Sequence, residues 1–355
     1  QSVRSHVYFQ QERQPVTCKT LHHSYYLWVS AQAQPAEAMS RAKSHLWRKT
    51  GASQLAATDD RPDMAEYAER IYPPILEERW AERRLDQKTV GAIRLHRSYR
   101  DDVWFCPWFN SLRTSFGLYL WGEQLNRKEW QDKAVQTRDL VLQAPQDQGL
   151  FPTVFVFSDP PRWVHSHHQG GGPGIYHLFD MSWTAYQLLR WYRHCTPEKE
   201  ILAFCKRYSD GIIALQEPGG GMPSFVDAIT FAPVQQVHHQ ALLQDLAKHP
   251  GGDAYIPYML ERHWTQDRFQ TSAESSASLL FLAELCHLWP AEDGYKTKLL
   301  NAALNIAAYL ERDIFPESKW LDFEVYYSCS PKPLTFYDHR SGQWPQNTLC
   351  LHLAA

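Results

Sequence analysis

The chain has 355 residues, of which 44% are apolar and 21% are charged, and its formal net charge is −3 with neutral histidines. The near balance of charge argues against a sequence-independent nucleic-acid binder, which needs a basic face. No run of roughly 18 apolar residues is present, so we expect no membrane span. This composition predicts a soluble, folded protein.

The first hundred residues are the least regular part of the sequence. Alternating apolar and polar residues over 5–30 indicate strand-like structure. Segments 36–48 and 61–85 have helical spacing. Pro73 and Pro74 should break the second of these helices, because proline lacks the amide hydrogen that a helix interior needs.

From residue 109 onward, predicted helices alternate between two kinds. One kind is apolar nearly all round, as in MSWTAYQLLRWY, and the other carries charges along one face, as in PEKEILAFCKRYSDGI. These patterns are typical of an inner helix buried on every side and an outer helix half exposed to water. The predicted helices cover 109–125, 128–144, 179–194, 197–216, 271–289, 294–313 and the stretch from 346 to the end.

The alternation repeats with a period of roughly 70 to 95 residues, which predicts helical hairpins joined by long loops. Each inner helix has a hydroxyl residue in its first turns, and each outer helix is followed by an aromatic residue or Met beside a proline. The loops contain strand-like pieces: TVFVF, SFVDAITF and WLDFEVYYS. The hydroxyl residues are Thr114, Thr184, Ser275 and Thr348, and the proline pairs are Phe151-Pro152, Met222-Pro223 and Phe315-Pro316.

This pattern resembles the (α/α) toroid of carbohydrate-active enzymes, the six-hairpin glycosidase-like superfamily that contains glycoside hydrolases and polysaccharide lyases. The resemblance covers about residues 100–355 and is carried by the hairpin arrangement and by the pieces FDMSWTAYQLLRWY and YDHRSGQWPQNTL. It implies an all-α fold, an (α/α)n toroid or barrel of helical hairpins whose long loops carry short β-strands. The motifs expected of the unsaturated uronyl hydrolases are not evident, so the sequence does not identify the sugar that the protein acts on.

Two parts are expected along the chain. Residues 1–60 form an N-terminal extension or cap that is partly strand-like, and 61–355 form the catalytic toroid. The chain has no initial Met and no signal peptide, and it ends inside a predicted helix. We therefore expect a toroid truncated in its last helix. The compartment cannot be read from such ends, and a secreted or periplasmic location is only slightly favoured over a cytoplasmic one.

In such a toroid, the loops that lead into the inner helices converge at one end, where helix N-termini favour a negatively charged group. Here these loops are 100–112, 153–182, 224–274 and 317–347. They contain several of the 14 tryptophans beside polar side chains, which suits sugars because sugar C–H faces stack on flat rings. The candidate substrate-binding residues are Trp104, Trp108, Asn110, Arg113, His165, His167, Tyr176, Glu274, His339, Arg340 and Trp344.

Several of these residues have alternative interpretations. His165, His167 and His168 could bind a sugar, act in acid–base catalysis, hold a metal or simply be solvated; we expect no metal and no cofactor. Asp180 opens a predicted helix and could be its N-cap. Glu274 fits a capping box in which Thr271 is the N-cap, and such a role does not exclude a place in the site.

Two chemistries fit these loops. A glycoside hydrolase needs two carboxylates that flank the scissile bond. The available acids are Asp180, Glu274, Glu324 and Asp338, and we favour Glu324 and Asp338.

A polysaccharide lyase instead needs a Tyr or His base and a group that neutralises the uronate carboxylate. Tyr176 or Tyr337, with His168, Asn110 and Arg113, would fill these roles. A non-catalytic glycan-binding ring is a third possibility.

We expect a glycoside hydrolase acting on an acidic, uronic-acid-containing glycan, with a lyase as the alternative. The expected partner is an oligo- or polysaccharide, with no nucleic acid and no membrane, and the sequence indicates no oligomeric state. The candidate catalytic residues are Glu324, Asp338, Asp180, His168 and Tyr337.

Overall fold

The computed structural model describes residues 41, 44–51, 63–94, 101–166, 174–234, 272–291, 293–316 and 352–354. Among them, residues up to 70 belong to a smaller compact unit and residues from 71 onward to a larger one. In the smaller unit, the helical residues 44–46 lead into a π-helix, Trp47–Gly51. Helix α3, Met64–Arg79, spans the boundary between the two units.

Helix α3 differs from the sequence prediction. It continues through Pro73 and Pro74 to Arg79, although the two prolines remove two backbone donors from the helix. Leu76, beyond the prolines, packs against the core, and this packing favours continuation of the helix. The predicted helix over 61–85 is therefore wrong at its end, where residues 80–85 form a strand.

That strand belongs to a hairpin. Strand β1 (Trp80–Leu85) pairs antiparallel with β2 (Lys88–Ile93), and Asp86 in the connecting turn has a positive φ of 51°. Val90 and Ala92 of β2 are fully buried. Residues 80–85 form a strand because they pair with β2, which packs against α5, and a local helical pattern does not contain these contacts.

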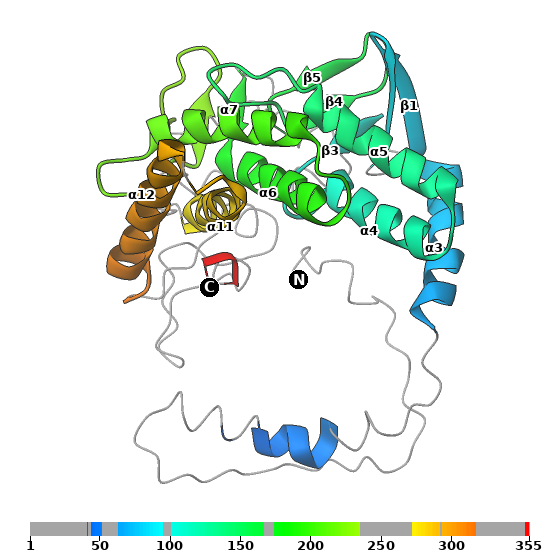
Figure 1. Cartoon of the computed structure of the whole chain (residues 1–355), viewed down its shortest axis with the longest axis horizontal. Coiled ribbons are helices and arrows are strands. Elements are labelled where there is room, and N and C mark those ends of the chain that lie inside the picture. The colour runs from blue at the N-terminus through cyan, green and yellow to red at the C-terminus, as the bar shows by residue number, and fades with distance from the viewer. Residues whose placement is uncertain are drawn as a thin grey trace, which may run out of the picture. The chain divides into compact units, whose positions relative to one another are not determined.

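Three helical hairpins make up most of the described part of the larger unit (Figure 1). Each has an inner and an outer helix, as predicted, and the helix bounds agree with the expected ranges to within a few residues. Helix α12 continues into a π-helix, η3, at Leu310–Ile314. The inner helices are α4 (Ser111–Gln124), α6 (Leu178–His194) and α11 (Ser272–Leu288), and the outer ones are α5 (Lys128–Leu142), α7 (Lys199–Leu215) and α12 (Gly294–Tyr309).

The inner helices lie side by side, with α6 contacting both α4 and α11 (Figure 1). Between α6 and α11, the Ser182 hydroxyl lies 2.9 Å from the Ser278 hydroxyl and 2.7 Å from that of Tyr208, and all three residues are buried. Small side chains allow the two helices to approach, and the mutual hydrogen bonds satisfy polar atoms that burial would otherwise penalise.

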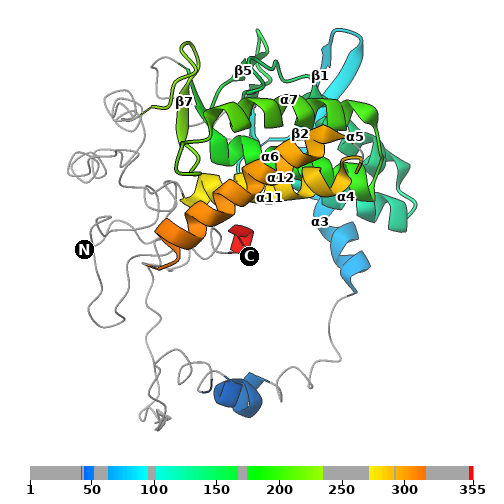
Figure 2. The same cartoon turned by 60° about the vertical axis from the view of Figure 1, so that its left-hand side comes forward.

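Each outer helix covers its inner partner, and α12 runs along α11 (Figure 2). This arrangement is the helical hairpin fold with inner and outer helices that the sequence predicted. No helix in the described ranges is long and apolar enough to cross a bilayer.

Short strands occupy the loops before the inner helices. Strands β3 (Asp102–Trp104), β4 (Val154–Val156) and β5 (Arg162–Val164) form one antiparallel sheet. Strand β6 (Ile175–His177) pairs antiparallel with β7 (Phe225–Asp227). The pieces TVFVF and SFVDAITF therefore each contain a three-residue strand, whereas WLDFEVYYS and the N-terminal segment 5–30 lie outside the described residues.

Gly149 allows the loop after α5 to lie directly against α7. Its φ is +86°, and a Cβ there would lie 2.2 Å from the backbone oxygen of Arg207. We expect Gly149→Ala to lower the free energy of unfolding by about 2–3 kcal/mol through backbone strain and this clash, as measured by urea unfolding. Gly294→Ala is the control because a Cβ there meets nothing within 4 Å. Equal losses in both variants would contradict the close approach.

Candidate functional site

The first turns of the three inner helices are joined by hydrogen bonds. The side-chain amide of Asn110, before α4, donates to the Thr184 hydroxyl of α6 over 3.2 Å, and Thr184 donates to the Phe105 carbonyl over 2.8 Å. On the other side of α6, Nε2 of His177 lies 3.4 Å from Oε1 of Glu274 on α11. The described loops that lead into the inner helices therefore meet at one end of the hairpins.

A cleft of about 180 Å³ opens at the start of α4. Four residues that the sequence analysis proposed for substrate binding line it together: Trp104, Trp108, Asn110 and Arg113. The sequence analysis did not select the other lining residues, which include Arg79, Arg94 and the half-exposed Phe109. Their nearness depends on packing of the β1–β2 hairpin and α3 beside α4, which the local pattern does not reveal.

Two side chains of the cleft are fixed by local bonds. Asn110 is the N-cap of α4, and its Oδ1 accepts a hydrogen bond of 2.9 Å from the backbone N–H of Arg113. The indole N–H of Trp104 donates to Asp102 over 3.1 Å, and its ring meets the edge of Phe109 with centroids 6.0 Å apart. The backbone at Arg113 and the ring of Trp104 are therefore held in place before any ligand binds.

The charge of the cleft is positive. Within the described part of the chain, the exposed guanidinium of Arg113 makes no ion pair and no hydrogen bond. Arg94, by contrast, donates to Asp101 over 2.9 Å. A free guanidinium beside aromatic rings suits a planar carboxylate, which it can bind through two parallel hydrogen bonds.

A buried charged cluster lies at the adjoining ends of α6 and α11. Nδ1 of His177 is 3.1 Å from Oδ1 of Asp180, its Nε2 faces Glu274, and none of the three side chains is more than 2% exposed. The ring also stacks on Phe225 of β7, with centroids 4.7 Å apart. Burial alone lowers the pKa of His177, but the two carboxylates outweigh it and raise the pKa to about 10.

His177 was missed by the sequence analysis. Its position three residues before Asp180 is a local signal, but Glu274 is 97 residues away. The interpretation of Asp180 as the N-cap of α6 is wrong. His177 occupies the N-cap position, and Asp180 is the third residue of the helix. Pairing of β6 with β7 ends there, and this sets the start of the helix. The proposed partner of Glu274 in a capping box, Thr271, lies outside the described residues.

The buried Tyr176 contacts His165, which is partly exposed. Their rings meet edge to face at 4.9 Å, and Tyr176 also stacks on Phe231. Burial, with a smaller contribution from Asp147, raises the pKa of Tyr176 to about 12. The phenol is therefore held in its neutral form.

The remaining candidates lie outside the described residues, so their placement stays a prediction. In the described part, no group of three or more His, Cys, Asp or Glu side chains is arranged to hold a metal ion. The candidates outside are His167, His168, Glu324, Tyr337, Asp338, His339, Arg340 and Trp344.

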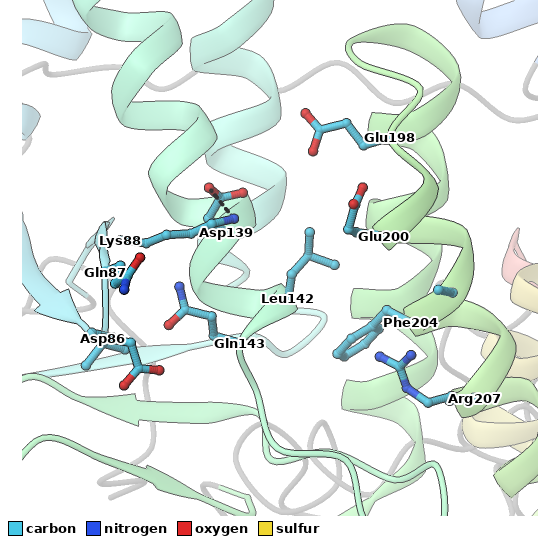
Figure 3. A pocket seen from close by; sticks show the side chains of 12 residues that line it. Asp86, Gln87, Lys88, Asp139, Leu142, Gln143, Glu198, Glu200, Phe204 and Arg207 are labelled. Atoms are coloured by element: carbon cyan, nitrogen blue, oxygen red, sulfur yellow. Dashed lines mark ion pairs between the residues drawn. The ribbon is translucent and has the colours of Figure 1, made fainter.

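A larger cavity of about 790 Å³ lies between the β1–β2 turn, α5 and α7 (Figure 3). Lys88 pairs with Asp139 on one wall over 3.6 Å, while Glu198, Glu200 and Arg207 come from α7 on the other. None of the residues that the sequence analysis proposed for the site lines this cavity. It lies between outer elements and is separate from the starts of the inner helices.

Comparisons with known proteins give similarities to solved structures only, because no family model and no curated protein matches the sequence. One is an unsaturated glucuronyl hydrolase from Bacillus sp. GL1 described as responsible for glycosaminoglycan degradation, with 14% identity, a TM-score of 0.42, and 60% of this chain and 47% of that chain aligned. Another is an unsaturated glucuronyl hydrolase specific for heparin, with 14% identity and a TM-score of 0.46. The alignment covers 76% of this chain and 59% of that chain. The chain spans about half the length of the first.

Proposed function

We propose that the protein is a carbohydrate-active enzyme, a glycoside hydrolase that acts on an acidic, uronic-acid-containing glycan. The cleft at the start of α4 is the observation that carries this proposal. It offers the rings of Trp104, Trp108 and Phe109 for the C–H faces of a sugar and the unpaired guanidinium of Arg113 for a uronate carboxylate.

Hydrolysis needs one protonated and one ionised carboxyl group on either side of the scissile bond. Asp180 and Glu274 are buried and face His177, so their carboxylates are held by an internal partner. We therefore keep Glu324 and Asp338 as the proposed acid pair, with Asp180 as the next candidate. His168 and Tyr337 remain further candidates in the same loops.

The alternative, a polysaccharide lyase, requires a base that removes the proton alpha to the uronate carboxylate. Tyr176 is poorly suited to this role because it is 3% exposed and its pKa is raised away from neutrality. This observation supports hydrolysis over elimination, leaving Tyr337 as the tyrosine that a lyase would use.

One assay separates these possibilities. The protein is incubated with uronate-containing polysaccharides while reducing ends and the absorbance of a new C=C bond are followed together. Reducing ends without absorbance support the proposal, and a parallel rise of both means elimination. Binding without either product would favour a glycan-binding protein.

Arg113→Gln tests the contact with the carboxylate. We expect kcat/KM on a uronate polysaccharide to fall by about 10- to 100-fold, because a hydrogen-bonded ion pair is lost. On the carboxyl-reduced form of the same polysaccharide the loss should be less than about threefold. Arg84→Gln, at another exposed arginine without a partner in the described residues, is the matched control. Equal losses on both substrates would contradict a carboxylate contact by Arg113.

A further inference from the structure

The cluster of His177, Asp180 and Glu274 connects two elements that are distant in sequence. His177 ends β6 and occupies the N-cap position of α6, Asp180 lies in the first turn of α6, and Glu274 lies in the first turn of α11. The contacts of 3.1 Å and 3.4 Å therefore tie the starts of two neighbouring inner helices together.

The geometry of the cluster favours a charged ring. A neutral imidazole has one donor nitrogen and one acceptor nitrogen, whereas an ionised carboxylate only accepts. Each ring nitrogen of His177 faces a carboxylate oxygen, so when both carboxylates are ionised the two contacts are attractive only if both nitrogens carry a proton. Among the described residues, the titratable groups that the structure places against the ring are Asp180 from α6 and Glu274 from α11, while β7 presents the ring of Phe225.

The same helix turn reaches the cleft. Asp180 and Thr184 are four residues apart on α6 and so share one face of the helix. Thr184 accepts the hydrogen bond from Asn110, which in turn holds the backbone at Arg113. A displacement of the first turn of α6 would therefore be transmitted to Asn110 and to the guanidinium that we assign to substrate binding.

We propose that His177 is a positioning residue whose imidazolium locks the first turns of α6 and α11 together and thereby sets the geometry of the cleft at α4. Its effect on turnover rests on the proposed function, whereas its charge and its effect on the cleft do not. A misplacement of about 1 Å at a reacting or binding group lowers rates by about 100-fold, so a buried lock of this kind has a measurable effect.

The charge is measured on the unmodified protein by nitrogen NMR of the histidine rings. One ring should keep both nitrogens protonated from pH 6 to pH 9, and its signals should be missing from His177→Gln. If this ring is neutral at pH 8, the proposal is wrong. This measurement requires neither activity nor a stable variant.

The lock is tested by hydrogen exchange and by activity. In His177→Gln, backbone amides of 110–114 and of the first turns of α6 and α11 should exchange at least tenfold faster, and kcat/KM should fall by about 100-fold. His287→Gln, at an exposed histidine of α11, should change neither. Unchanged exchange over 110–114 would overturn the link to the cleft. If the unmodified protein turns over no glycan, the proposed function fails while the exchange result still decides the lock.

A paired variant separates positioning from stability. His177→Gln combined with Glu274→Gln also removes the buried negative charge that faced the imidazolium and should recover part of the lost thermal stability. If His177 positions the cleft, exchange over 110–114 should remain fast in the pair. If slow exchange over 110–114 returns together with thermal stability, His177 acts only on folding.

Discussion

His177→Gln is expected to lower the free energy of unfolding by about 3–5 kcal/mol at pH 6, which is the usual cost of removing one partner from a buried ion pair. The side chain is fully buried, and its loss removes the positive charge that contacts the buried carboxylates of Asp180 and Glu274. Urea unfolding of the variant and the unmodified protein at one pH measures the difference directly.

The same difference should depend on pH. The pKa of His177 is about 10 in the folded protein and about 6.5 in the unfolded chain, so the folded state binds the proton more tightly. The stabilisation is fully present below about pH 6.5 and decreases by up to about 1.4 kcal/mol for each pH unit as the pH rises toward 10. The two proteins should therefore approach each other in stability by about pH 10. A difference that stays constant from pH 6 to pH 10 would show that the ring is not charged.

Trp191→Ala is expected to lower the free energy of unfolding by about 3–5 kcal/mol, because a large side chain leaves a cavity that the core fills only in part. The indole is fully buried in α6, its N–H donates to Thr196 over 3.0 Å, and its ring contacts the edges of Phe116 and Tyr119. Chemical denaturation monitored by circular dichroism provides the measurement.

Trp183→Ala is the matched control for this prediction because it removes the same side chain from the same helix. Trp183 is only partly buried, so the expected loss is less than about 2 kcal/mol. Equal losses in the two variants would show that Trp191 does not occupy the tightly packed position between α6 and α4.

The helical hairpins and the local part of the candidate site could be predicted from sequence patterns. The periodicity of six segments predicted α4, α5, α6, α7, α11 and α12 closely, because amphipathic patterns report burial over a few turns. Trp104, Trp108, Asn110 and Arg113 lie within ten residues of one another, and they line one cleft because a short strand and a helix cap fix their relative positions.

Contacts between distant segments depend on how the helices pack and could not be predicted from local patterns. The end of α3 and the β1 strand were mispredicted because packing on the core, rather than local propensity, selects strand over helix there. His177 and Glu274 are 97 residues apart, and their pairing exists because α6 and α11 lie side by side. Periodicity states which face of a helix is buried but not which neighbour covers it, so the charged lock between these helices could be found only from the assembled core.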